Sequence, residues 1–144
     1  MANALYPKWK EALLQGTAAA LLNGSGTTGV YAALVDTGVY TYNTADEFWD
    51  EGGANDPKDG LIGTAMEVGA TKTYTNGVFD GADVLYSAVS GNSAEAIVFF
   101  VKNAGAETTW RLVGYLDTNI TNLPVTPNGG NISAAWNASG IFGL

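Results

Sequence analysis

The sequence contains no cysteine and no histidine. Without cysteine there are no disulfides and no thiol nucleophiles. Without either residue type, the usual zinc sites, haem ligation and the Ser-His-Asp triad are all excluded. We therefore expect no metal, no cofactor and no enzymatic activity. The absence of cysteine does not indicate the cellular compartment.

Charge is scarce, and positive charge especially so. Charged residues make up 14% of the 144 residues, well below the roughly 25% of ordinary soluble domains. The chain has six basic and 14 acidic residues, which gives a net charge of −8. Nucleic-acid binding depends on clustered Lys and Arg, and binding to anionic membranes needs positive charge as well. We therefore expect neither nucleic acid nor membrane as a partner.

Long hydrophobic runs are lacking too. The first residues lack the basic and apolar regions of a secretory signal peptide, and the apolar run at 18–22 is too short to cross a bilayer. Hydrophobic residues, in contrast, make up 47% of the chain, and glycine occupies 19 positions. This is the composition of one turn-rich domain with a core of its own.

The first 16 residues predict a helix. Asn3 is a candidate N-cap, Pro7 is tolerated in the first turn, and Gly16 is a C-terminal stop. Within the expected helix at 3–15, Leu5, Trp9 and Leu13 form one apolar stripe. We expect this stripe to dock either on the chain's own sheet or on a neighbouring subunit.

Residues 17–144 predict a single all-β domain. Turn signals recur every 8–12 residues, as in a β-sandwich, a jelly-roll-like fold or a partly open barrel of about eight or nine short strands. The Asn76-Gly77 pair is a strong hairpin signal. The run at 94–102 is the most hydrophobic, so we expect it to be the central strand with 110–116 as its partner. The other candidate strands are 30–35, 39–42, 61–68, 71–74, 78–80, 84–89, 132–136 and 141–142.

Residues 45–60 form a loop of a different kind. Six carboxylates and one lysine surround Phe48 and Trp49, with Gly52-Gly53 and Pro57 as breakers. Loops of this length are often functional. Aromatic residues flanked by charges resemble interface anchors, which makes Phe48 and Trp49 contact candidates. Ca²⁺ is a further possibility, although the acidic residues do not follow EF-hand spacing, so a solvated negative loop is the simpler reading.

One motif suggests an enzyme. Asp36-Thr37-Gly38 follows three apolar residues, as in retropepsin-like aspartic proteases, where two such chains each supply an Asp and the pair shares a proton. The same triplet also suits an ordinary turn, which is the reading we favour.

Two other groups allow alternatives in carbohydrate chemistry. Trp49, Trp110 and Trp136 could stack on a sugar in a receptor- or carbohydrate-binding module, although Trp110 and Trp136 are in strand-like contexts that favour a core role. Asp80 and Asp83 could form a glycosidase pair, but they flank a glycine turn that accounts for them.

In their order along the chain, several segments resemble a family of small structural proteins encoded by tailed bacteriophages. The C-terminal part is the most distinctive, and residues 52–60 depart from the family. The resembling segments are 5–8, 10–15, 33–37, 40–42, 46–48, 75–84, 93–96 and 123–130, continuing through Trp136 to Phe142. The resemblance implies a virion component and supplies no catalytic residues.

The sequence therefore predicts a non-enzymatic virion structural protein. We expect a capsid decoration (cement) protein on the outer head surface, assembled in the host bacterial cytoplasm. Its expected partners are the major capsid protein or other virion proteins, and we expect a homo-oligomer, either a dimer or a trimer. The alternatives are a tail, baseplate or head-fibre component and a receptor-binding module. The candidate contact residues are Leu5, Trp9, Leu13, Phe48 and Trp49.

Overall fold

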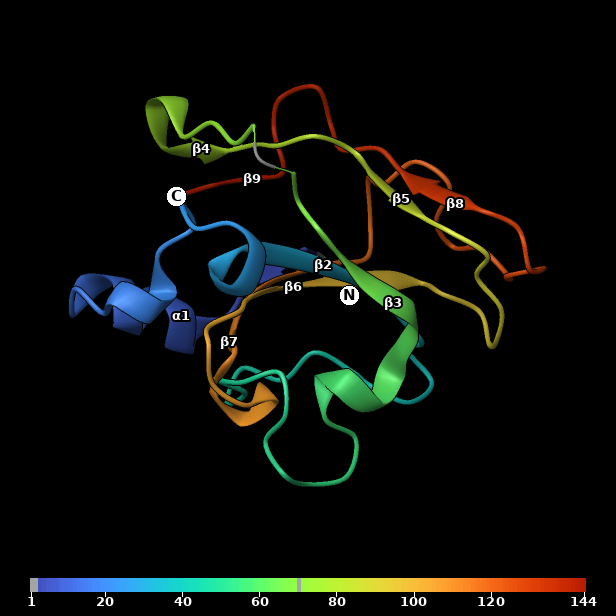
Figure 1. Ribbon diagram of the computed structural model, residues 1–144, viewed down its shortest axis with the longest axis horizontal. Coiled ribbons are helices and arrows are strands. Elements are labelled where there is room, and N and C mark those ends of the chain that lie inside the picture. Colours follow the sequence, from blue (N-terminus) through green and yellow to red (C-terminus); the bar gives the residue numbers. More distant parts are fainter. Residues whose placement is uncertain (1–2, 70) are drawn as a thin grey trace.

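The computed structural model describes residues 3–69 and 71–144. Within them it contains nine strands and one α-helix, joined by loops and short 3-10 turns (Figure 1). The helix is α1 (Pro7–Leu14), and the strands are β1 (Ala4–Leu5), β2 (Val30–Val35), β3 (Leu61–Glu67), β4 (Val78–Phe79), β5 (Val84–Tyr86), β6 (Ala96–Val101), β7 (Arg111–Leu116), β8 (Ile132–Ala134) and β9 (Phe142–Gly143).

The core is built on a five-stranded antiparallel sheet with the order β1-β7-β6-β2-β3. All six residues of β6 are buried, because β6 has strands on both sides and is covered on both faces. Val98 pairs with Ala33 on β2 and with Tyr115 on β7. The prediction of a central strand at 94–102 with 110–116 as its partner is confirmed.

Two short ribbons, β4-β9 and β5-β8, form the rest of the fold. Figure 1 shows both ribbons on one side of the large sheet and the 45–60 segment on the other. Tyr86 of β5 ties the layers together, because its buried hydroxyl donates to the Ala32 carbonyl of β2 at 3.1 Å. The prediction of an all-β fold with one helix is confirmed. The finer choice among sandwich, jelly roll and partly open barrel stays a prediction.

The helix begins later than predicted. Pro7 is its first residue and Tyr6 precedes it in an extended conformation, because the residue before a proline is pushed out of the helical region. Leu5 therefore lies in β1 rather than on the helix, and its place in the apolar stripe was wrong. Asn3 is not an N-cap either: its side-chain oxygen accepts hydrogen bonds from the Asp117 and Thr118 amides.

The Asn76-Gly77 hairpin is confirmed, whereas two predicted strands are not formed as such. Asn76 and Gly77 both have positive φ, and the chain pairs again at Thr73 and Asp80, the only pairing within 71–74. Residues 39–42 form no strand, because the chain turns at 36–40: the Val39 and Tyr40 amides both donate to the Asp36 carbonyl. No helix in the described residues has both the length and the apolar character needed to cross a membrane.

Candidate functional site: an apolar groove beside the helix

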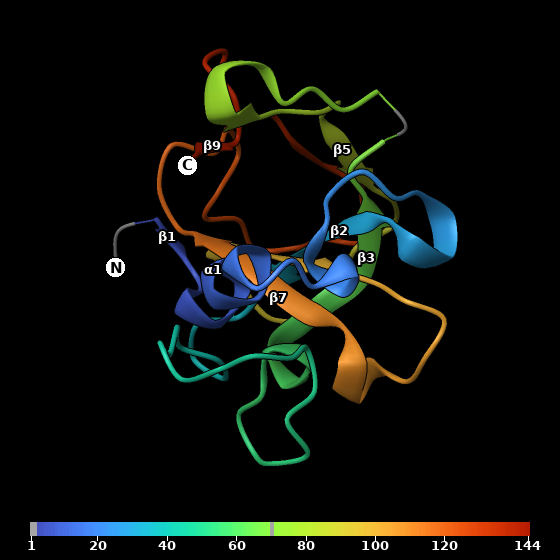
Figure 2. The same cartoon turned by 90° about the vertical axis from the view of Figure 1, so that its left-hand side faces the viewer.

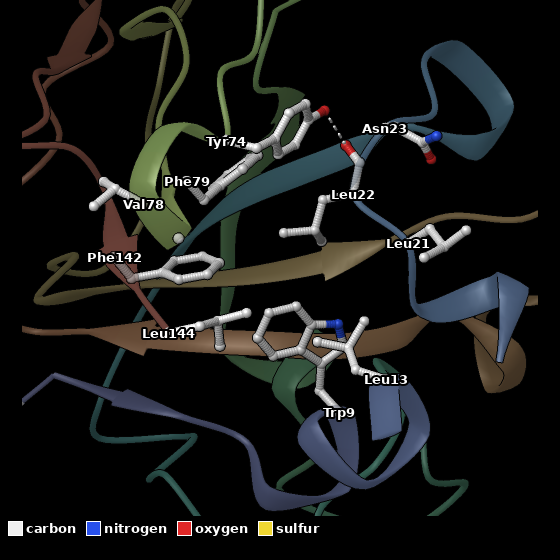
Figure 3. Close-up of a pocket in the computed structure, with 11 residues that line it drawn as sticks. Trp9, Leu13, Leu21, Leu22, Asn23, Tyr74, Val78, Phe79, Phe142 and Leu144 are labelled. Atoms are coloured by element: carbon white, nitrogen blue, oxygen red, sulfur yellow. Dashed lines mark hydrogen bonds between the residues drawn. The ribbon is translucent and has the colours of Figure 1, made fainter. Parts of the chain in front are cut away.

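An apolar groove of about 340 Å³ opens between α1 and the β4-β9 ribbon (Figure 3). The helix supplies Trp9 and Leu13 to one wall. The segment after α1 supplies Leu21 and Leu22, and the opposite wall comes from residues 74–79 and from Phe142 and Leu144. Four stretches that are distant in sequence therefore meet at one place.

Aromatic packing holds the floor of the groove. The Trp9 and Phe142 rings meet edge to face with centroids 5.6 Å apart, and Phe79 packs on Phe142 at 5.1 Å. The Trp9 indole is fully buried, and its Nε1–H donates to the Ala20 carbonyl at 2.8 Å. This bond fixes the helix against the segment that follows it. The floor is therefore rigid and already complete in its hydrogen bonding.

The rim is also tied down. The Tyr74 hydroxyl donates to the Leu22 carbonyl at 3.1 Å, which joins the two sides of the groove (Figure 3). The Leu144 amide donates to the Gly77 carbonyl at 2.9 Å. None of the described residues that line the groove has a charged side chain. The lining side chains therefore offer mainly shape and apolar surface to a partner.

Of the predicted contact residues, the groove brings together Trp9 and Leu13. Leu5 lies nearby, partly buried on β1. Trp9 is wholly buried in its own domain, so the helix docks on the chain's own sheet and only part of the predicted stripe, at Leu13, reaches the surface. The contributions of Leu21, Leu22 and Tyr74 were missed; the only signal for the two leucines was the apolar run at 18–22.

The loop at 45–60 is a loop as predicted, but Trp49 is not exposed. Its side chain is 2% exposed, and its ring stacks on Phe100 of β6 with centroids 4.3 Å apart. The expectation of an exposed anchor at Trp49 was wrong, because the loop folds back on the sheet: the Trp49 amide donates to the Trp110 carbonyl at 2.8 Å. Phe48 is partly buried under the Arg111 guanidinium, 5.0 Å from its ring centroid.

The carboxylates of this loop are engaged by the chain itself. The buried Asp56 accepts from the Glu51 and Gly53 amides at 3.0 and 2.9 Å. Asp56 also forms a capping box with Asp59, whose side chain accepts from the Asp56 amide. Two ion pairs join the loop to cations, Asp50 to Lys58 and Glu47 to Arg111. The described residues contain no cluster of three or more possible metal-binding side chains. The loop is thus fixed both by hydrogen bonds within itself and by its contact with β7.

A buried chain of hydroxyls fixes the start of this loop. Tyr6 donates to the Tyr40 hydroxyl at 2.6 Å, and Tyr40 donates to Asp46 at 2.8 Å. Burial raises the pKa of the Asp46 carboxyl, and the hydrogen bond from Tyr40 works against that rise. Burial also raises the pKa of Tyr6 well above its ordinary value, with Tyr40 adding to the effect. Both phenols therefore stay protonated and act as donors.

The Asp36-Thr37-Gly38 motif makes a turn at the end of β2. One Asp36 oxygen accepts from the Gly38 amide at 2.7 Å, and the other accepts from the Asn92 side chain at 2.9 Å. These are the bonds expected of an aspartate that shapes a turn. Asp83 has a similar role, because it accepts from the Trp136 amide at 2.9 Å.

The remaining tryptophans are partly buried against the core. The Trp110 ring lies parallel to Phe100, with centroids 5.7 Å apart, and the Lys102 ammonium lies 4.5 Å from its centroid. Trp136 packs on Phe99 at 5.3 Å. Both rings therefore take part in packing on β6, which agrees with the core role favoured from the sequence.

No family model matches the chain, and a search of curated proteins finds no match for it. The chemistry of the site is that of a groove with mainly apolar walls and no charged side chain in its lining.

Proposed function

We propose that this protein is a non-enzymatic structural component of a tailed-phage virion, acting as a decoration protein of the capsid. The observation that carries the proposal is the apolar groove, whose lining has no charged side chain. A surface of this kind favours protein–protein contact, because apolar area is gained on association and no charge has to lose its water. The sequence resemblance to small phage structural proteins supports the same reading.

The charge of the chain supports a place on the outside of the head. A net charge of −8 opposes contact with packaged DNA, whose phosphates would need Lys and Arg partners. The major capsid protein is the proposed partner, and the protein would act by holding neighbouring subunits of the lattice together.

The test is the number of copies in a purified particle, measured by quantitative mass spectrometry against the major capsid protein. A decoration protein follows the symmetry of the lattice, so we expect on the order of hundreds of copies per virion. A count of about 3 to 12 would place the protein in the tail or baseplate instead. Absence of the protein from washed particles would reject a virion role altogether.

A further inference from the structure

A second hollow, of about 430 Å³, is lined almost entirely by side chains that carry oxygen. The lining residues of this acidic cleft are Thr37, Thr41, Glu95, Tyr115, Asp117 and Pro124. None of them lines the apolar groove. The turn after β2, which supplies the two threonines, runs along the face of the large sheet opposite the β4-β9 and β5-β8 ribbons (Figures 1 and 2). The acidic cleft is therefore a separate site.

Tyr115 is the buried tyrosine whose hydroxyl the chain leaves open. The other buried tyrosines, Tyr6, Tyr40 and Tyr86, each have a hydroxyl that is hydrogen-bonded to an oxygen of the chain. Tyr115 is only 2% exposed, yet its hydroxyl makes no hydrogen bond to any described residue and the side chain lines the cleft. Since buried polar groups are nearly always hydrogen-bonded, this hydroxyl indicates a partner from outside the chain.

Glu95 holds a fixed negative charge in the same cleft. Its Oε2 accepts from the Thr37 amide at 3.0 Å and from the Thr37 hydroxyl at 3.3 Å. Its other oxygen accepts no hydrogen bond from the described residues. Glu47 and Asp50 are each paired with a cation of the chain, whereas Glu95 forms no ion pair within the described residues. The carboxylate is therefore held in position without being neutralised there.

Asp117 adds a second carboxylate to the lining. Burial raises the pKa of Tyr115, and the charges of Asp117 and Glu95 add to that rise. Both carboxylates therefore act on the Tyr115 hydroxyl, which stays protonated at neutral pH. The negative charge and the open hydroxyl lie at one place.

We propose that the acidic cleft binds an organic cation with N–H donors, that is, an ammonium or guanidinium group. Glu95 supplies the opposite charge, and the Tyr115 oxygen accepts one of the N–H groups. Hydrogen bonds from such a cation to a carboxylate are roughly twice as strong as those between neutral groups. The inference does not depend on the proposed function, because it uses no residue of the apolar groove.

The lining of the cleft favours this class of ligand over others. It has no basic side chain among the described residues, so an anion would meet only repulsion. A bare metal ion takes several carboxylate or carbonyl oxygens at short distance, and the part of the chain that the structure describes has no group of three or more suitable side chains. The hydroxyls of Thr37, Thr41 and Tyr115 can all accept hydrogen bonds, as an N–H donor requires.

An NMR titration of the full chain with butylammonium chloride tests the inference. We expect saturable shifts at the Thr37 amide and the Tyr115 ring, with a dissociation constant of about 1–10 mM for one ion pair in an open cleft. Tetramethylammonium carries the same charge but no N–H donor, so it should bind at least about fivefold more weakly. A short lysine peptide identifies the source: tighter binding than butylammonium points to a protein side chain, and weaker binding points to a free amine.

Two variants assign the binding to named atoms. Tyr115→Phe removes only the hydroxyl and should weaken butylammonium binding about tenfold, while the urea midpoint of the ligand-free chain should not fall. Glu95→Gln removes the charge and should weaken binding at least as much. The matched controls are Tyr31→Phe, whose lost hydroxyl donates to the Gly26 carbonyl, and Glu107→Gln at an exposed position. Neither control residue lines the cleft, so binding should stay within about twofold of that of the unmodified chain.

Four outcomes would overturn the inference. Shifts that remain linear up to about 100 mM butylammonium would mean that the cleft holds only water. Equal binding of tetramethylammonium would remove the role of N–H donors, and tighter binding of Ca²⁺ at the same resonances would assign the cleft to a metal ion. Unchanged binding by Tyr115→Phe would show that the open hydroxyl takes no part.

Discussion

The loop at 45–60 and the groove beside α1 were both candidates for contact with a partner, and they differ in what they leave unsatisfied. In the loop, Asp56 accepts hydrogen bonds from two backbone amides, and Asp46 accepts one from the Tyr40 hydroxyl. The Trp49 ring is buried against Phe100. In the groove, every polar atom described above is bonded, but apolar area remains open. Unpaired apolar surface, rather than local charge or aromatic content, therefore marks the better contact site.

The largest effect should come from Trp49, which tests whether the loop is core or contact surface. Trp49→Ala removes a ring that is 2% exposed and stacked on Phe100. Truncation of a buried tryptophan costs about 3–5 kcal/mol, so we expect the free energy of unfolding in urea to fall by about that amount. A loss below about 1 kcal/mol would mean that the loop is an exposed surface after all.

The next effect concerns Asp56, which organises the loop. Asp56→Ala leaves the Glu51 and Gly53 amides without their acceptor and removes the capping box with Asp59. We expect a loss of about 1–3 kcal/mol in the free energy of unfolding. Hydrogen exchange should accelerate at the Glu51 and Gly53 amides but not in β6. Equal acceleration in both would show that the loop does not fold as a separate local unit.

A smaller effect should follow from Asp46. Because the folded chain raises its pKa, chiefly by burial, the ionised carboxylate is less favourable in the folded state than in the unfolded chain. Asp46 thus lowers stability at neutral pH, and that penalty fades as the pH falls through the raised pKa to below the ordinary value of 3.8.

Asp46→Asn should therefore stabilise the protein at pH 7, by an amount that shrinks to nothing in acid. Urea unfolding at a series of pH values checks this prediction. Glu107→Gln is the control, because it makes the same change from carboxylate to amide at an exposed position. If the Asn variant is instead less stable at pH 7, the bond from Tyr40 outweighs burial.

The smallest effect on folding should come from the rim of the groove. Leu21 is 48% exposed, so Leu21→Asp should change the free energy of unfolding by no more than about 0.5 kcal/mol, whatever it does to association. Thermal unfolding at low protein concentration checks this. A large loss would mean that the rim is part of the core, and the contrast with the loop would disappear.

The sequence predicted the parts of the fold whose pattern is local. Residues 96–101 are apolar at successive positions because β6 is covered on both faces, and Asn76-Gly77 turns because both residues take positive φ. In residues 39–42 the tyrosines alternate with other residues as in a strand, but here the alternation reflects the packing of the tyrosine rings. Tyr42 packs on the rings of Tyr6 and Tyr115, and Tyr40 packs beside Tyr115.

The groove was beyond prediction because its walls come from four separate stretches. Trp9 and Leu13 were selected by their spacing on the helix, but nothing local links Leu21 to Tyr74 or Phe142. The prediction for Trp49 failed for the converse reason: Trp49 lies in an acidic stretch of the sequence, whereas its neighbour in space is Phe100. Both outcomes depend on tertiary contacts, which one sequence does not display.

The pairing of β1 with β7 has a consequence for the newly made chain. Leu5 pairs with Gly114, and Asn3 bonds to Thr118, so β1 is synthesised long before the strand with which it pairs. The strand β2 likewise waits for β6. At about 5–20 residues per second, the N-terminal half spends several seconds without the strands that bury it. Chaperones would have their main opportunity to bind in that interval, before residues 96–118 emerge and the large sheet can form.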